Sequence, residues 1–303
     1  KDIRGSLKRL EIGGTLGTGE LLDIAGLLEN AGRAKAYSRR DTEEENLDSL
    51  DGMFQILEPL TPLSSEIRRC ILSPEEIADD ASPGLHQVRR GMKNINEKIH
   101  GQLASYISGN ARTYLQDGVI TMRNGRYCIP VKSEYRSQVP GMIHDQSSTG
   151  STVFVEPMAV VKLNNDLREL EAKEQAEIEI VLSNLSQTAG ENLDLLQDDL
   201  KILAQLDFIF ARALLAKAQN ATEPRFNTEG IINLKKARHP LIEKHQVVPI
   251  DIRLGESFDL LVVTGPNTGG KTVSLKTVGL LTLMGQSGLH IPAFDNSQLS
   301  VFQ

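Results

Sequence analysis

The sequence contains no tryptophan, and only 4% of its 303 residues are aromatic. So few aromatic side chains favour a helix-rich protein with long exposed helices over one whose core depends on aromatic packing. Only two cysteines occur, Cys70 and Cys128, and they lie far apart and in no metal-like spacing. They predict two buried thiols in a reducing cytoplasm, without a disulfide framework.

Long hydrophobic runs are also missing. The longest contain four apolar residues, as in residues 260–263, so no segment is predicted to span a membrane. No signal peptide is visible. The net charge of −7 argues against a uniformly basic nucleic-acid binder but leaves room for a local basic patch. An apolar content of 40% and room for two domains are typical of a soluble multidomain protein.

The sequence contains a glycine-rich run at residues 265–272. It fits the phosphate-loop pattern G-x-x-x-x-G-K-[ST] at every fixed position. Residues 258–264 before it are predicted to form a buried strand, and residues 273–281 after it a helix. Glycines let backbone N–H groups turn toward a phosphate, and the helix start adds positive potential. The predicted nucleotide-binding residues are Gly265, Pro266, Asn267, Thr268, Gly269, Gly270, Lys271 and Thr272.

Lys271 is predicted to reach the β- and γ-phosphates of ATP, and the Thr272 hydroxyl to hold Mg²⁺. Hydrolysis also needs a hydrophobic strand that ends in an acidic residue, and none of the 31 residues after Thr272 supplies one. Asp295, the one acidic residue there, follows Pro-Ala-Phe. The chain, which starts at Lys1, is therefore predicted to be a fragment that binds ATP without hydrolysing it, and it holds no complete set of catalytic residues.

The hydrophobic pattern divides the chain into four regions and predicts a multidomain α plus α/β fold. Residues 1–117 are predicted to be helical, with one helix start at residues 73–76 and a helix of about 30 residues from Leu85. Residues 118–158 are predicted to be a β-rich insertion around the hairpin signal Asn124-Gly125. Long helices are expected over 159–223, with a break near 188–190, and α/β structure over 224–303. The helix lengths favour a lever with a β tip over a compact bundle.

These motifs also carry a resemblance. The phosphate loop together with the segment Leu-Leu-Thr-Leu-Met-Gly-Gln-Ser-Gly-Leu-His-Ile-Pro-Ala at 280–293 looks like the MutS ATPases, and so does Ala-Arg-His-Pro-Leu-Ile at 237–242. The stretches 129–136, 144–150 and 154–157 are similar to the type 2 branch of that family and not to the mismatch-repair enzymes. The resemblance covers nearly the whole chain.

The resemblance implies a homodimer whose subunits each have a lever of long helices, a clamp at its tip and an ABC-type ATPase at its base. Residues 118–158 would be the clamp, and 224–303 the first part of the ATPase domain, truncated before the acidic Mg²⁺-binding strand. Type 2 members lack the mismatch-recognition domain and usually carry a C-terminal endonuclease domain, which is absent from this chain. The family is associated with suppressing recombination on branched DNA and with rescuing collided ribosomes.

The resemblance also bears on the nucleotide base. It places Asn267 near the γ-phosphate and the segment around Val248 and Pro249 on the adenine ring. The repair enzymes have an aromatic residue in that segment, so its absence here predicts weak base selectivity. His239 is a further candidate for the adenine side, and a buried structural turn is an equal alternative for it.

Basic residues gather in the predicted β insertion. Between residues 119 and 137, four basic side chains stand against the single acid Glu134: Arg123, Arg126, Lys132 and Arg136. Such an excess predicts contacts to phosphates of DNA arms or of ribosomal RNA. An ordinary solvated hairpin is the alternative.

Two other functional classes stay open. Another ABC-like ATPase, of the chromosome-structure or double-strand-repair kind, is disfavoured because its loop comes near the N-terminus, whereas 264 residues precede Gly265 here. A non-hydrolysing module that grips nucleic acid or the ribosome would be indicated by nucleotide-independent binding. The sequence does not choose between DNA and the ribosome as the working substrate.

Overall fold

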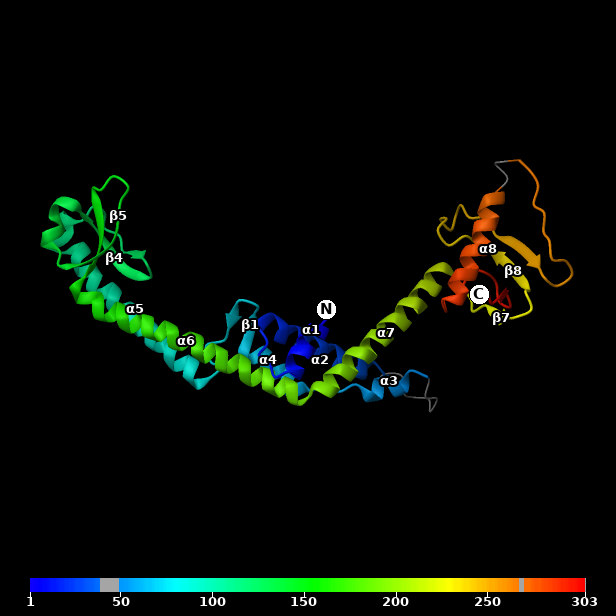
Figure 1. The fold of residues 1–303 in the computed structure, drawn as a ribbon, viewed down its shortest axis with the longest axis horizontal. Helices are drawn as coiled ribbons and strands as arrows, with labels where there is room; N and C mark the ends of the chain where they lie inside the picture. Colours follow the sequence, from blue (N-terminus) through cyan, green and yellow to red (C-terminus); the bar gives the residue numbers. More distant parts are fainter. Residues whose placement is uncertain (39–48, 267–269, 303) are drawn as a thin grey trace. The chain divides into compact units, whose positions relative to one another are not determined.

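The computed structural model describes residues 1–38, 49–266 and 270–302, and Figure 1 labels their helices and strands. The described chain combines long helices with small sheets and divides into two compact units, Lys1–Leu200 and Lys201–Gln303. A mixed fold of α and α/β parts is therefore confirmed, and the two units are described separately below. None of the described helices is long and apolar enough to cross a membrane.

Unit 1 begins with a helical core formed by α1 (Arg4–Glu11), α2 (Thr18–Ser38) and α4 (Thr61–Cys70), with α3 (Asp51–Ile56) beside α2. On α2, Leu21, Ile24 and Leu28 recur at three- and four-residue spacing and are fully buried. Both cysteines are free and buried, Cys70 in this core and Cys128 in the sheet described below, as the sequence predicts.

The predicted helix start at residues 73–76 is wrong. These residues close a short antiparallel hairpin between β1 (Ile71–Ser73) and β2 (Glu76–Ile77). The helix begins instead at the second Ser-Pro pair of this region, where the Ser82 hydroxyl accepts the Leu85 N–H at 3.0 Å. Both pairs carry the same local signal. After the first pair the chain turns back instead, so that Ile71 and Ile77 pair across the hairpin and are both buried in the core.

Two long helices, α5 (Pro83–Ser108) and α6 (Met158–Glu191), pack side by side and connect two hydrophobic cores (Figure 1). Leu85 and Leu185 lie in the helical core at one end, and Leu103 and Val160 lie in a second core at the other. The two helices therefore run in opposite directions. The 30-residue helix expected from Leu85 ends at Ser108, where Gly109 leads into the 3₁₀ helix η2 (Asn110–Tyr114).

The second core lies under a four-stranded antiparallel sheet, which together with η2 and η3 (Ser133–Gln138) is called the tip. Its strands β3 (Thr121–Arg123), β4 (Arg126–Lys132), β5 (Gly141–Gln146) and β6 (Thr152–Pro157) follow the order β3-β4-β6-β5. Asn124 and Gly125 have φ of 53° and 71°, so the predicted hairpin turn is confirmed.

Helix α6 ends at Glu191, and α7 (Leu193–Gln219) starts after the non-helical Asn192. The predicted break near 188–190 is thus found two residues further on. Helix α7 begins in unit 1, where Leu196 joins the helical core, and continues into unit 2. There the Arg212 guanidinium donates a hydrogen bond to the Gly288 carbonyl.

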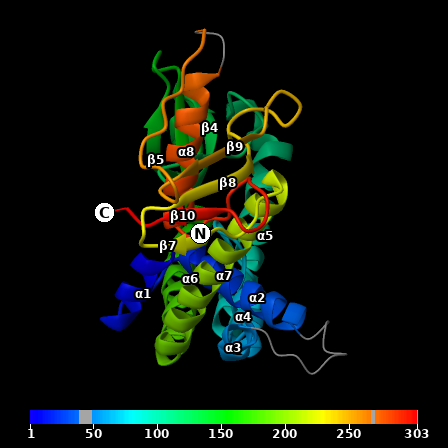
Figure 2. The same cartoon turned by 90° about the vertical axis from the view of Figure 1, so that its right-hand side faces the viewer.

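Unit 2 contains a second four-stranded sheet, with the order β7-β10-β8-β9. The strands are β7 (Arg225–Asn227), β8 (Ile232–Ala237), β9 (Ile250–Leu254) and β10 (Gln298–Ser300). Helix α8 (Lys271–Gln286) lies against this sheet (Figure 2), because Leu281 and Met284 share a core with Leu234 and Leu299. The helix predicted after the glycine-rich run is confirmed.

The strand predicted over 258–264 is not formed. These residues pair with no strand of the described sheet, and Leu260 and Val262 expose 78% and 71% of their surface. A strand is stable only where neighbours satisfy its backbone N–H and C=O groups and cover its apolar side chains. The apolar run is therefore present in the sequence, but no described strand lies beside it to form the backbone hydrogen bonds of a sheet.

One acidic residue of unit 1 is buried and forms no ion pair with any residue that the structure describes. Asp199 of α7 is 1% exposed; one carboxylate oxygen accepts the Glu58 N–H at 2.9 Å, and the other has no hydrogen-bond partner within the described ranges. Burial raises the pKa of this carboxyl from 3.8 to about 6. The folded chain thus holds this proton more tightly than the unfolded chain does.

This raised pKa predicts a stability that falls as pH rises. The contribution of Asp199 is complete below pH 4 and is lost as pH rises through about 6, which corresponds to about 2–3 kcal/mol. Urea unfolding near pH 4 and near pH 8 measures it. We expect Asp199→Asn to remove this part of the pH dependence, and Asp194→Asn, which changes an exposed acid on the same helix, to leave it intact. Identical pH slopes in all three proteins would contradict the assignment.

Candidate functional site

The first candidate site is the start of α8. Gly270 precedes the helix in the left-handed region, with φ of 75°, and Gly265 has φ of 141°. Glycine adopts these values without steric cost. Lys271 is the first helical residue, and its ammonium donates to the Gly265 carbonyl, so the side chain points back toward Gly265. Of the predicted nucleotide-binding residues, Asn267, Thr268 and Gly269 lie outside the described part of the chain.

The donors at this helix start suit a phosphate. They are the Lys271 ammonium, the exposed Thr272 hydroxyl and the first N–H groups of a 16-residue helix. A cavity of about 500 Å³ lies beside them, lined by Lys271, Thr272 and Ser274 and by apolar side chains that include Ile252 and Leu275. The site therefore combines positive potential with an adjoining apolar surface. Among the described residues, no group of three His, Cys, Asp or Glu side chains could hold a metal ion.

The residues predicted on the adenine side do not line this cavity. Val248 and Pro249 belong to the exposed segment before β9, where Val248 is 77% exposed, and neither lines this cavity. His239 does not line it either, and its Nδ1 accepts the Leu241 N–H at 3.3 Å. That bond stabilises a local turn, which was the structural alternative for His239.

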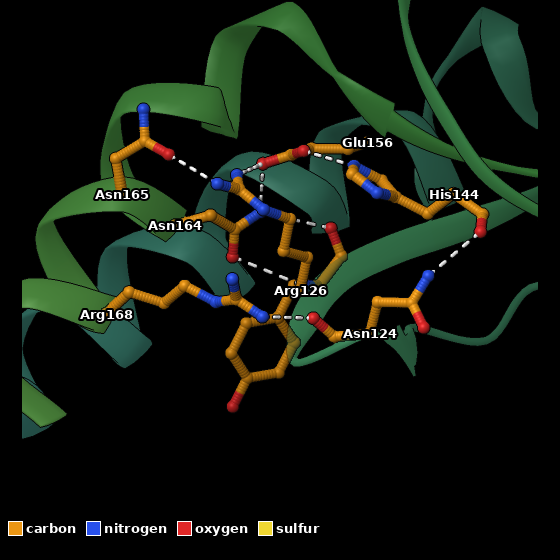
Figure 3. A network of polar contacts seen from close by, with 8 residues as sticks. Asn124, Arg126, His144, Glu156, Asn164, Asn165 and Arg168 are labelled. Carbon is orange, nitrogen blue, oxygen red and sulfur yellow. Dashed lines mark hydrogen bonds and ion pairs between the residues drawn. The ribbon is translucent and has the colours of Figure 1, made fainter.

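The second candidate site is a polar network inside the tip (Figure 3). Its centre is Glu156, whose side chain is completely buried at the end of β6. One carboxylate oxygen accepts Arg126 Nη1 at 2.7 Å and Asn164 Nδ2 at 2.8 Å, and the other contacts His144 Nε2 at 2.5 Å. Two donors and the His144 ring thus surround the buried carboxylate, and such partners are what stabilise a buried carboxylate.

This network connects the sheet to α6. Arg126 also donates to Asn165 Oδ1 at 2.6 Å. Asn164 accepts the Tyr127 N–H and donates to the Tyr127 carbonyl, both at 3.2 Å. Nearby, Arg168 donates to the Asn124 carbonyl at the hairpin turn. The orientation of the β3–β4 hairpin on α6 therefore depends on these bonds.

Sequence reasoning missed Glu156. The available signal was an acidic residue within the apolar run Val-Phe-Val-Glu-Pro, where an exposed charge is unexpected. The basic residues that the sequence assigned to nucleic acid are also placed differently from what the charge count suggested. Arg126 is held by Glu156, and Arg123 lies 3.1 Å from Asp145 and 4.0 Å from the centre of the Phe154 ring.

The remaining two basic residues are more accessible. Lys132 is half-buried and donates to the Thr113 carbonyl at 3.2 Å, and Arg136 is exposed on η3. Over residues 118–158 as a whole, the four basic side chains face three acidic ones, because Asp145 and Glu156 lie just beyond the stretch with the basic excess. The tip is thus close to neutral, and its free cations lie on one part of it.

Comparisons with known proteins give the family. No protein-family model matches the chain. It is 59% identical over all 303 residues to "Endonuclease MutS2" of Agathobacter rectalis and spans 38% of that protein. The protein of the same name from Lachnoclostridium phytofermentans is also 59% identical and is covered to 39%. For the one from Caldanaerobacter subterraneus subsp. tengcongensis the identity is 49% and the coverage 38%.

These matches include the phosphate-loop run, the tip and the long helices, since each covers the entire chain. The chain spans about two fifths of the length of the curated relatives that it matches. It belongs to the type 2 branch of the MutS family.

Proposed function

We propose that this chain is the ATP-binding and nucleic-acid-gripping part of a MutS type 2 ATPase. The proposal that the chain binds ATP rests on the start of α8. There Gly270, in the left-handed conformation, is followed by Lys271 and Thr272 in the first turn of the helix, and a cavity lies beside them. In this proposal the loop N–H groups and Lys271 bind the phosphates, and the apolar side of the cavity lies next to the loop.

The Thr272 hydroxyl would hold Mg²⁺, which when bound neutralises phosphate charge. Thr272 is the one residue of this chain that we assign to Mg²⁺. Hydrolysis also needs a carboxylate at the end of a strand, and the sequence does not supply one. We therefore assign ATP binding to this chain and ATP hydrolysis to the parent protein. The relatives are named endonucleases, and we assign any nuclease activity likewise to other segments of a parent protein.

The tip would be the part that contacts nucleic acid. In support, its sheet is fixed on α5 and α6 by a full hydrophobic core and by the Glu156 network, so a force applied to it would be carried by the helices. We propose that the parent protein acts as a homodimeric clamp on branched DNA or on collided ribosomes. Nucleotide-dependent changes would be passed between the units through α7, which belongs to both.

The metal part of this proposal gives a prediction. ATP binding to the chain is expected to tighten when Mg²⁺ is added, and Thr272→Val, which removes the hydroxyl but keeps the shape, is expected to abolish most of that gain, about tenfold. Titration with a fluorescent ATP analogue, with Mg²⁺ or with a chelator, measures both values. Ser274→Ala is the matched control, because the Ser274 hydroxyl is used by the Gly270 carbonyl. An equal gain in wild type and Thr272→Val would remove Thr272 as the metal ligand.

A further inference from the structure

The four cations of residues 118–158 fall into two groups. Arg123 and Arg126 each have a carboxylate within 4.0 Å, at Asp145 and Glu156. Lys132 and Arg136 have none among the residues that the structure describes, although Glu134 lies between them in sequence. An unpaired cation on a protein surface is available for an external anion. Within residues 118–158 the free positive charge is therefore located where β4 passes into η3, and η2, which contacts η3, adds the exposed Arg112.

Two tyrosines lie at the same place. Tyr135 of η3 and Tyr114 of η2 have ring centres 5.3 Å apart and planes inclined by 34°, so the two rings form a tilted aromatic pair in direct contact. The Lys132 ammonium lies 5.9 Å from the centre of the Tyr135 ring and is held to η2 by the Thr113 carbonyl. Tyr114 packs against the second hydrophobic core, whereas Tyr135 is 37% exposed. The Tyr114 ring is thus fixed by the core, and the Tyr135 ring packs against it at the surface.

We propose that Tyr114, Tyr135, Lys132 and Arg136 form a stacking platform for unpaired nucleotides, and this rests on the nucleic-acid contact proposed above. An exposed aromatic ring can stack on a base of any sequence, and adjacent cations hold the neighbouring phosphates. Such stacking requires that the base is out of a duplex, because paired bases offer only their edges in the grooves. The platform therefore selects single-stranded segments, such as those exposed at a branch point or in a loop.

The structure favours stacking over simple charge attraction. Between residues 110 and 158 the tip has five basic side chains against four acidic ones, so its general field is weak. A surface that gripped duplex phosphates alone would need more cations spread along the groove. What sets the platform apart is a preorganised aromatic pair joined to two free cations. That combination discriminates between single and double strands.

The test compares a single-stranded thymidine oligonucleotide with a blunt duplex of the same length. The single strand carries one 2-aminopurine, whose fluorescence falls when it stacks on an aromatic ring. In wild type we expect binding of the single strand with quenching. Tyr135→Ala is expected to weaken this binding at least about fivefold and to remove the quenching, with less than a twofold change for the duplex. Tyr135→Phe, which keeps the ring, is expected to behave as wild type.

The charge variant separates the two components of the platform. Arg136→Gln is expected to weaken binding and to lower its salt dependence by about one released counterion, while the quenching of bound 2-aminopurine persists. Equal losses for single strand and duplex in Tyr135→Ala, or unchanged quenching, would overturn the platform and leave the nucleic-acid contact standing. If wild type bound neither oligonucleotide, both the platform and the proposed contact at the tip would fall. Thermal unfolding of each variant confirms that the tip is folded.

Discussion

Replacing Glu156 with alanine is expected to destabilise the tip by about 3 kcal/mol. The carboxylate is completely buried and accepts bonds from Arg126 and Asn164 and contacts His144. Removing it leaves the Arg126 guanidinium, which is only 18% exposed, without its counter-charge. Losing one partner of a buried ion pair costs about 3–5 kcal/mol, and the partial exposure of Arg126 favours the lower end of that range.

The buried thiol of Cys128 offers a measurement of this effect. Burial raises the pKa of Cys128 to about 11, so in the folded tip this thiol reacts slowly with a maleimide at neutral pH. In Glu156→Ala, transient unfolding of the tip should expose it and accelerate its labelling by about 100-fold. Mass spectrometry distinguishes it from Cys70, which lies in the helical core and should keep its rate.

A matched control exists in the same tip. Glu134 is exposed on η3 and has no ion pair among the described residues, so Glu134→Ala should leave the labelling of Cys128 unchanged. Glu156→Gln keeps the shape of the side chain and one acceptor oxygen. Its rate of Cys128 labelling should fall between those of Glu134→Ala and Glu156→Ala. Equal labelling rates in wild type and Glu156→Ala would show that the network does not stabilise the tip. The network also means that charge reversal at Arg126 cannot test nucleic-acid contact, since it would disturb the fold.

Replacing Lys271 with alanine is expected to weaken ATP binding by about 10- to 100-fold. Hydrogen bonds to charged groups contribute about 1.5–3 kcal/mol, and each 1.4 kcal/mol is a factor of ten in affinity. In the structure the ammonium donates to the Gly265 carbonyl at the start of the glycine-rich run, and in this prediction it exchanges that bond for one to a phosphate. Calorimetric titration with Mg²⁺-ATP measures the change.

The control for this experiment lies on the same helix. Lys276 is exposed on α8, five residues further along, and Lys276→Ala removes the same charge without touching the loop. It should bind ATP about as wild type does. If both lysine variants lost the same affinity for ATP, the loss would come from the change in net charge and not from a specific contact of Lys271 with the phosphates. If wild type bound no nucleotide, the loop would need further segments of the parent protein, and the nucleotide half of the proposal would not apply to this chain.

Local patterns in the sequence were enough to predict the elements whose structure depends on residues close to one another in the chain. The Asn124-Gly125 turn was predictable because its positive φ values favour those two residue types, and α2 and α6 because their apolar residues recur at helical spacing. The same reasoning failed at residues 73–76 and 258–264. At 73–76 the helix-start signal was present, but the chain forms the β1–β2 hairpin, which buries Ile71 and Ile77. At 258–264 the apolar run was present, but no described strand pairs with it.

The sequence by itself determined the family, the phosphate-loop pattern and the order of helical and β regions, because these are written in residue types and their spacing. Only the tertiary structure decided which charges are free. Arg126 looked like a surface cation until the fold brought it to Glu156, 30 residues away, and the Tyr114–Tyr135 pair arose only when η2 met η3. Charge pairing and stacking depend on distances in space, and a linear count of basic residues contains no such distances.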